Sequence, residues 1–255
     1  RWCRCPSAAK DPGAYVSNIV KLIERERYDV LFPTHEQVYV LSRFRESLGK
    51  RVGLAVPAFE SLRRMQSKAE FSRLMNDLSL PTPVSRIVDC ESEVISHQQF
   101  PCYLKLAHST ASLGVKRAED RAGLVAAVAD FKRAGLWSDG TEILIQQPAK
   151  GRQAEVSAVF QDARLIAVSC ADVLATGIGG GPALRVSAEH RDVVDHIKQL
   201  GSALQWHGPM VLEYFYDSST GKPEYIEANP RIGESFNSLL SGVNVCDLVA
   251  RISLG

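Results

Sequence analysis

The spacing of hydrophobic residues in the first quarter of the chain alternates between the period of a helix and the short runs of buried strands. Residues 12–27 and 36–48 have helical spacing, whereas the apolar runs at 28–33 and 51–56 are typical of strands. This order favours a parallel sheet flanked by helices. We therefore expect the later part of a doubly wound α/β domain, without its first strand and glycine turn.

The pattern changes in the rest of the chain. Residues 57–80 predict two helices, with Ser67 as the N-cap of the second. Strands and helices then alternate up to residue 148. From Glu142 to Glu227, short segments with apolar and polar positions in alternation predict four or more antiparallel strands. The chain is therefore a mixed α/β (α+β) protein, with expected parts at 1–64, 65–148 and 149–255.

Two acidic residues lie in a predicted hairpin of aromatic and β-branched residues. Glu213 is in its first strand, and Glu227 and Asn229 share one face of its second strand because strand side chains alternate. Two carboxylates and an amide oxygen that converge suit a hard divalent cation such as Mg²⁺. An edge hairpin whose acids meet only water is an equal alternative from this stretch alone.

Two lysines stand where a positive charge is costly. Lys68 begins a predicted helix, where the helix dipole opposes a cation, and Lys105 lies in the middle of an apolar strand. A nearby anion would explain both, although a solvated surface lysine is the commoner explanation for Lys68. The loop at 108–115 carries hydroxyls and a glycine that suit a phosphate, but such loops are also common as plain turns.

The composition excludes several classes of function. The 255 residues are 45% hydrophobic and 23% charged, with a net charge of +1. This balance is ordinary for a globular protein and gives no long-range field for nucleic acid or an anionic membrane. No apolar run approaches the roughly 20 residues that span a bilayer. The six cysteines are scattered, so we expect a reduced, cytoplasmic protein.

A glycine-rich segment, residues 176–182, invites a nucleotide-loop interpretation but fails its pattern. Pro182 stands where the third glycine of a dinucleotide motif should be, and no helix follows directly. A mobile lid or substrate loop, with Arg185 just behind it, fits better.

Taken in order, these segments resemble the ATP-grasp superfamily, above all its carboxylate–amine ligase-like members and the ATP-binding domains of biotin carboxylase and carbamoyl-phosphate synthetase. The resemblance covers about residues 57–240. Its most specific part is Glu213 followed by Glu227-Ala-Asn229-Pro-Arg231, which is similar to the family's metal and phosphate motif. The other similar segments are 67–71, 100–105, 112–115 and 145–157. The resemblance implies an ATP-grasp fold, in which two α+β subdomains clasp ATP behind a partial α/β domain.

The resemblance also implies a role for each matching position. ATP would be held by side chains at its phosphates and ribose and by the backbone at its adenine; Mg²⁺, or Mn²⁺ in its place, would bridge the phosphates. The implied phosphate contacts are Lys68, Lys105 and Ser112, the adenine contacts are Gln146, Gln147 and Ala149, and the ribose contact is Glu155. The implied metal ligands are Glu213, Glu227 and Asn229, and the implied catalytic residues are Arg231, Arg185 and Lys105.

The implied activity is that of an ADP-forming ligase. ATP would convert a small-molecule carboxylate into an acyl phosphate, which an amine would then attack. Dimers are common in the superfamily, so a homodimer is also expected. Two alternatives stay open: activation of bicarbonate, as in the carboxylases, and a nucleotide-binding module without catalysis.

Overall fold

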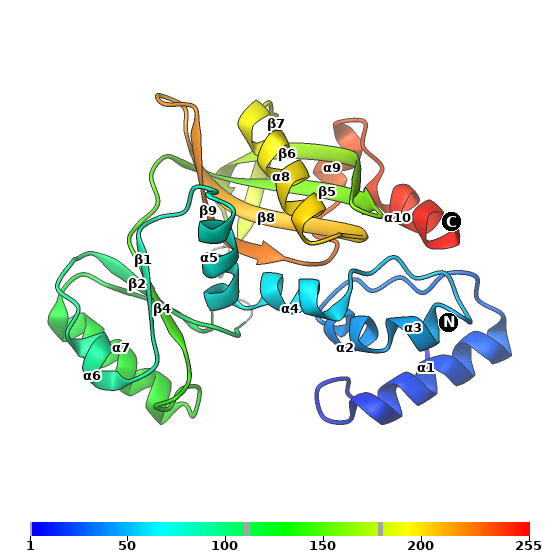
Figure 1. Ribbon diagram of the computed structural model, residues 1–255, viewed down its shortest axis with the longest axis horizontal. Helices are drawn as coiled ribbons and strands as arrows, with labels where there is room; N and C mark the ends of the chain where they lie inside the picture. Colours follow the sequence, from blue (N-terminus) through cyan, green and yellow to red (C-terminus); the bar gives the residue numbers. More distant parts are fainter. Residues whose placement is uncertain (1, 110–112, 178–180) are drawn as a thin grey trace.

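The computed structural model describes residues 2–109, 113–177 and 181–255. Figure 1 shows a helical N-terminal part, a sheet covered by two helices, and a larger sheet that carries the C-terminal helices. Two helices in the middle of the molecule, α4 (Phe59–Gln66) and α5 (Lys68–Asp77), lie between these three parts. The mixed α+β fold class is confirmed.

The N-terminal part keeps its predicted helices but not its predicted strands. It contains α1 (Pro12–Glu26), α2 (Gln37–Arg43) and α3 (Arg45–Leu48). The strands expected at 28–33 and 51–56 were wrong, because these segments meet through a single parallel bridge between Val30 and Gly53. Parallel strand pairing is less stable than antiparallel pairing. The Ala55 N–H does not extend the bridge into a ladder but donates to Ser253 Oγ at 3.1 Å.

The two middle helices form as predicted. Ser67 is the N-cap of α5, and its hydroxyl accepts a hydrogen bond from the Glu70 N–H at 3.3 Å. One face of α5 enters the core of the larger sheet through Phe71, Leu74 and Met75. The first turn of α5 is therefore fixed beside that sheet.

The smaller sheet is antiparallel, with the strand order β1-β4-β2-β3. Its strands are β1 (Ser85–Val88), β2 (Cys102–Leu106), β3 (Val115–Ala118) and β4 (Ile143–Gln146). Helices α6 (Glu91–Ile95) and α7 (Arg121–Arg133) cover one face, where Leu124, Val128 and Phe131 pack on the strands. The other face of the sheet carries Lys105 and Gln146, which are hydrogen bonded to each other.

The larger sheet is also antiparallel, with the strand order β7-β6-β5-β8-β9. Its strands are β5 (Arg152–Gln161), β6 (Arg164–Thr176), β7 (Pro182–Ala188), β8 (Gly208–Asp217) and β9 (Lys222–Asn229). Helix α8 (Arg191–Ala203) packs on its core face, and α9 (Phe236–Leu240) and α10 (Val245–Leu254) follow β9. The predicted hairpin of β8 and β9 is confirmed.

The N-terminal part and the larger sheet share a hydrophobic core. Ala55 packs there with Ile232, Val249 and Ile252. The predicted boundaries of the three parts stay a prediction, although the two sheets meet between the end of β4 at Gln146 and the start of β5 at Arg152. Within the described chain, no helix is both long and apolar enough to cross a membrane.

Candidate functional site

Three carboxylates lie in one row across adjacent strands of the larger sheet. Glu155 of β5 pairs in register with Glu213 of β8, and Glu213 pairs with Glu227 of β9. Like charges directly opposite one another destabilise a sheet. Burial, and then the charges of Glu227 and Glu155, raise the pKa of the Glu213 carboxyl above its usual range. Such a row needs cations to stay ionised.

Lys68 supplies one of these cations. Its Nζ lies 2.8 Å from Glu227 Oε1 and also donates to the Ser109 carbonyl oxygen at 3.2 Å. The side chain of Lys68 is only 4% exposed. A solvated surface lysine, the commoner explanation from sequence, is therefore wrong. The N-terminus of α5 carries a buried lysine because a carboxylate faces it.

Lys105 approaches the same row from the smaller sheet. Its buried Nζ donates to Gln146 Oε1 at 2.6 Å and to the Ile226 carbonyl oxygen at 3.5 Å. A register shift in the β8–β9 pairing falls between Glu213 and Tyr214, next to this carbonyl. Burial lowers the pKa of Lys105 to about 8, although the negative charge of Glu227 acts to raise it. Gln146 is fixed in turn, since its Nε2 donates to Ser85 Oγ at 3.0 Å.

The other end of the row is held by arginine. Arg185 Nε forms an ion pair with Glu155 Oε1 at 2.6 Å, with both side chains nearly buried. Burial raises the pKa of Glu155 in spite of this partner. The predicted ribose contact and one predicted catalytic arginine therefore bind each other in this state.

Asn229 and Arg231 form a chain of contacts beside Glu213. Asn229 Nδ2 donates to Glu213 Oε1 at 3.2 Å, and Arg231 Nη2 donates to Asn229 Oδ1 at 3.1 Å. Arg231 Nε donates to Glu36 Oε1 at 3.2 Å. The predicted metal ligands and the arginine of the motif therefore lie together at the end of β9.

Glu36 is the residue that the sequence did not single out. It occupies the N-cap position of α2, where no side-chain capping bond forms. Nothing local in the sequence pairs this acid with Arg231, and only the fold brings the two side chains together.

Two of the predicted adenine contacts, Gln147 and Ala149, lie on the connection from β4 to β5, and the third, Gln146, is the last residue of β4. The Gln147 N–H donates to the Val84 carbonyl oxygen at 2.9 Å, and the Lys150 N–H donates to Glu224 Oε2 at 2.7 Å. Ala149 lies between them on the same connection. Ser112 and the glycines at 179 and 180 fall outside the described residues.

The donor set fits a divalent cation between β8 and β9. Glu213 and Glu227 offer carboxylate oxygens and Asn229 an amide oxygen, which are the ligand atoms that Mg²⁺ prefers. The register pairing that sets Glu213 opposite Glu227 is the structural observation that supports this fit, because a cation between the two carboxylates would offset their repulsion. Lys68 and Lys105 add two positive charges for an anionic ligand such as a phosphate group.

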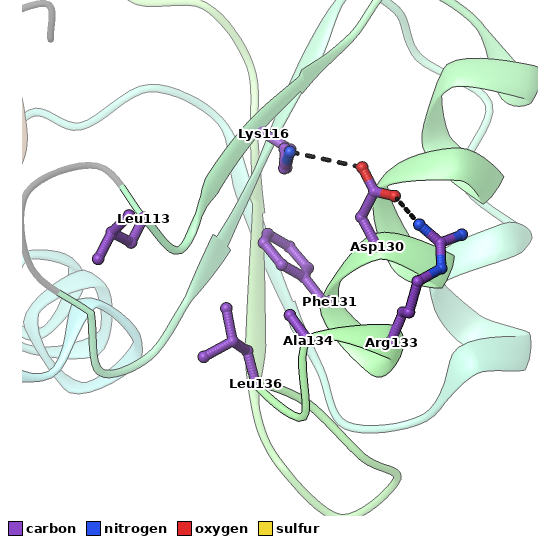
Figure 2. Close-up of a pocket in the computed structure, with 7 residues that line it drawn as sticks. All are labelled: Leu113, Lys116, Asp130, Phe131, Arg133, Ala134 and Leu136. Carbon is purple, nitrogen blue, oxygen red and sulfur yellow. Dashed lines mark hydrogen bonds and ion pairs between the residues drawn. The ribbon is translucent and has the colours of Figure 1, made fainter.

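A separate hollow of about 420 Å³ lies on the smaller sheet, between β3 and the C-terminal end of α7 (Figure 2). Asp130 bridges Lys116 and Arg133 at its rim, and Phe131 contributes to its lining. None of the carboxylates of the row lines this hollow. It is therefore distinct from the site.

The sequence is distantly related to the large chain of carbamoyl phosphate synthase, whereas no family model matches it. It is 24% identical to that protein from Pyrococcus furiosus, over 76% of this chain and 19% of the relative. It is 23% identical to that from Clostridium acetobutylicum, over 94% of this chain and 23% of the relative. The chain thus spans about a fifth to a quarter of the length of these relatives.

The fold is similar to solved structures of two kinds of enzyme. The biotin carboxylase domain dimer of Hydrogenobacter thermophilus 2-oxoglutarate carboxylase, in complex with MgADP, ADP and bicarbonate, aligns with a TM-score of 0.78 at 16% identity, over 96% of this chain and 58% of that one. The L-amino acid ligase of Bacillus licheniformis aligns with a TM-score of 0.74 at 19% identity, over 98% of this chain and 62% of that one.

Proposed function

From the ATP-grasp fold of this chain, which confirms the resemblance stated from its sequence, we propose that the protein is an ATP-dependent, ADP-forming ligase. It phosphorylates a small-molecule carboxylate and passes the acyl group to an amine. The observation that carries this proposal is the pairing of Glu213 with Glu227, next to Asn229 and two buried lysines.

Glu213, Glu227 and Asn229 are proposed to hold Mg²⁺, with Mn²⁺ as a substitute. The metal held there would supply positive charge that offsets the negative charge of the ATP phosphates. In the state described, Lys68 neutralises Glu227. With Mg²⁺ held by these residues, Lys68 would be free to contact a phosphate oxygen. Glu227 is therefore proposed both as the partner of Lys68 and as a metal ligand.

The lysines and the connection between the sheets are proposed to bind ATP. Lys105 keeps a positive charge in an apolar strand, which strengthens its interaction with phosphate because little water competes. The backbone at Gln146, Gln147 and Ala149 would contact adenine. Glu155 would bind the ribose after releasing Arg185. Both sheets therefore contribute to one nucleotide site.

The reaction consists of two substitutions. A carboxylate oxygen of the substrate attacks the γ-phosphorus of ATP, forming an acyl phosphate and breaking the bond to ADP. The amine nitrogen then attacks the acyl carbon, phosphate leaves, and the amine loses a proton. Arg231 and Arg185 stabilise the transferring phosphoryl group and the acyl phosphate by charge and alignment.

A second candidate is activation of bicarbonate to carboxyphosphate. The relatives named carbamoyl phosphate synthase and the neighbour solved with bicarbonate favour it. It uses the same ATP and metal residues, so only the dependence on substrate separates the two. The neighbour's dimer also supports a homodimer of this chain as a proposal.

Trapping with hydroxylamine tests the proposal. Acyl phosphates react with hydroxylamine to give stable hydroxamates, so a panel of carboxylates with MgATP should yield one hydroxamate-forming substrate. Formation should require ATP and Mg²⁺ and should disappear in Glu227→Gln. ADP release that depends on bicarbonate, with no hydroxamate, would select the second candidate. Neither signal, from protein that binds MgATP, would favour a nucleotide-binding module.

A further inference from the structure

Glu36 connects the N-terminal part of the chain to the motif at the end of β9. It lies 195 residues from Arg231 in sequence, yet its Oε1 accepts from Arg231 Nε at 3.2 Å. Its Oε2 accepts from Gln66 Nε2, at the end of α4, at 2.8 Å. Both side chains of the ion pair are largely shielded, with 19% of Arg231 and 30% of Glu36 exposed.

This ion pair limits the directions in which the guanidinium can point. Nε is bound by Glu36, Nη2 by Asn229 Oδ1, and Nη1 by the Ile232 carbonyl oxygen at 3.3 Å. A guanidinium is planar, and its donors diverge in a fixed fork. Contacts on all three nitrogens therefore set the plane of the group relative to Asn229.

The same contacts reach the proposed metal ligands. The amide oxygen of Asn229 accepts a hydrogen bond from Arg231, and its amide nitrogen donates one to Glu213. A shift of the Arg231 guanidinium would therefore move the Asn229 amide. Partners of this kind orient metal ligands and tune their affinity. Glu36 lies at the far end of this chain of contacts and is itself fixed by Gln66.

We propose that Glu36 is a positioning residue: it holds the Arg231 guanidinium in the orientation in which that group binds an oxyanion next to the metal. This inference rests on the proposed function. It assigns the N-terminal part a direct role in the site, beyond packing against the larger sheet. It also predicts an effect of opposite sign from simple electrostatics, because removing a nearby negative charge would otherwise strengthen the binding of an anion.

The experiment measures binding of inorganic phosphate, as the oxyanion probe, to the full chain loaded with MgADP. The variants are Glu36→Ala, Glu36→Gln, Arg231→Gln and the double variant Glu36→Ala with Arg231→Gln. Glu46→Ala, an exposed acid in α3, is the control. Glu36→Gln keeps the shape of the side chain and serves where the alanine variant folds poorly. MgADP affinity is measured first for every variant.

We expect Glu36→Ala to lower phosphate affinity by about tenfold, the loss typical of one hydrogen bond to a charged group, when every variant is held at saturating MgADP so that a change in metal-nucleotide affinity does not contribute. Glu36→Gln should recover part of the loss, because its amide oxygen still accepts from Arg231. In the Arg231→Gln background, Glu36→Ala should have no further effect. Glu46→Ala should match the wild type.

Two results would overturn the inference alone. One is phosphate affinity that rises, or stays level, in Glu36→Ala. The other is an equal loss in the presence and absence of Arg231, which would mean that Glu36 acts independently. Failure of the wild type to bind MgADP would instead overturn the proposed function, and the inference with it.

Discussion

Lys105 is a cation that the fold buries almost completely in the strand of a small sheet. Its hydrogen bonds to Gln146 Oε1 and the Ile226 carbonyl oxygen satisfy two of its three donors. Burial still disfavours the charged form, which is why its pKa falls to about 8 from 10.5. A protein tolerates such a cost where the cation has a further use, and phosphate binding is the use that we propose.

This burial predicts a pH dependence of stability. Between the folded pKa of about 8 and the unfolded value of 10.5, the unfolded chain binds the proton of Lys105 more strongly than the folded chain does. The free energy of unfolding should therefore rise with pH across this window, by up to about 1.4 kcal/mol per pH unit from this group. Urea unfolding of the metal-free protein at successive pH values measures the slope.

Lys105→Met is the control for this slope. Other lysines, tyrosines and cysteines titrate in the same window, so only the difference between the wild type and the variant isolates Lys105. The contribution should vanish in the variant. An identical slope in both proteins would show that Lys105 keeps an ordinary pKa in the folded chain.

The sequence indicates the buried charges but not their partners. Lys68 and Lys105 stand out because a helix start and an apolar strand are costly places for a cation. Glu227 as the partner of Lys68 depends on how α5 meets β9, and Glu36 as the partner of Arg231 joins residues 195 apart in sequence. Contacts between distant elements leave no local pattern, so hydrophobic spacing could not predict them.

Gly151 connects the two sheets, in the short segment between β4 and β5. Its φ of +100° lies in the region that favours glycine, and a Cβ there would lie 2.3 Å from the Tyr216 carbonyl oxygen. Both strain and overlap with backbone therefore oppose any side chain. We expect Gly151→Ala to lower the free energy of unfolding by about 3 kcal/mol in total. A left-handed alanine without steric overlap would cost only about 1 kcal/mol.

Gly135→Ala is the matched control for this prediction. Gly135 also has a positive φ, of +66°, but nothing lies within 4 Å of a Cβ built there. The free energy of unfolding of Gly135→Ala should fall only by the conformational cost of a left-handed alanine. Equal urea midpoints for the two variants would mean that the segment at Gly151 shifts freely, contrary to a fixed connection between the sheets.

Among helices and strands, the sequence predicts long periodic segments better than short apolar runs. The helices α1, α5 and α7 and the hairpin of β8 and β9 follow from their own spacing and caps. The runs at 28–33 and 51–56 were expected to be strands, but the structure has one bridge. A strand exists only where a neighbour accepts its hydrogen bonds, and an apolar run does not reveal its neighbours.

Across the whole molecule, the candidate site draws on every part of the chain. Glu36 comes from the N-terminal part, Lys105 from the smaller sheet, and Glu213 and Glu227 from the larger sheet. Lys68, at the start of the helix between the sheets, contacts the last of these. A ligand that bridges these parts should stabilise the whole fold rather than one sheet.

The thermal unfolding midpoint with and without MgATP tests the central claim most directly. At a ligand concentration of about 100 times the dissociation constant, binding adds about 2.7 kcal/mol, or roughly 5 to 10 °C for a chain of this size. The wild type and Glu60→Gln, an exposed acid of α4, should show this shift. Glu227→Gln, and the wild type with excess EDTA, should show little of it. Equal shifts in Glu227→Gln and the wild type, or no shift in the wild type at saturating nucleotide, would contradict a metal-nucleotide site at this row of carboxylates.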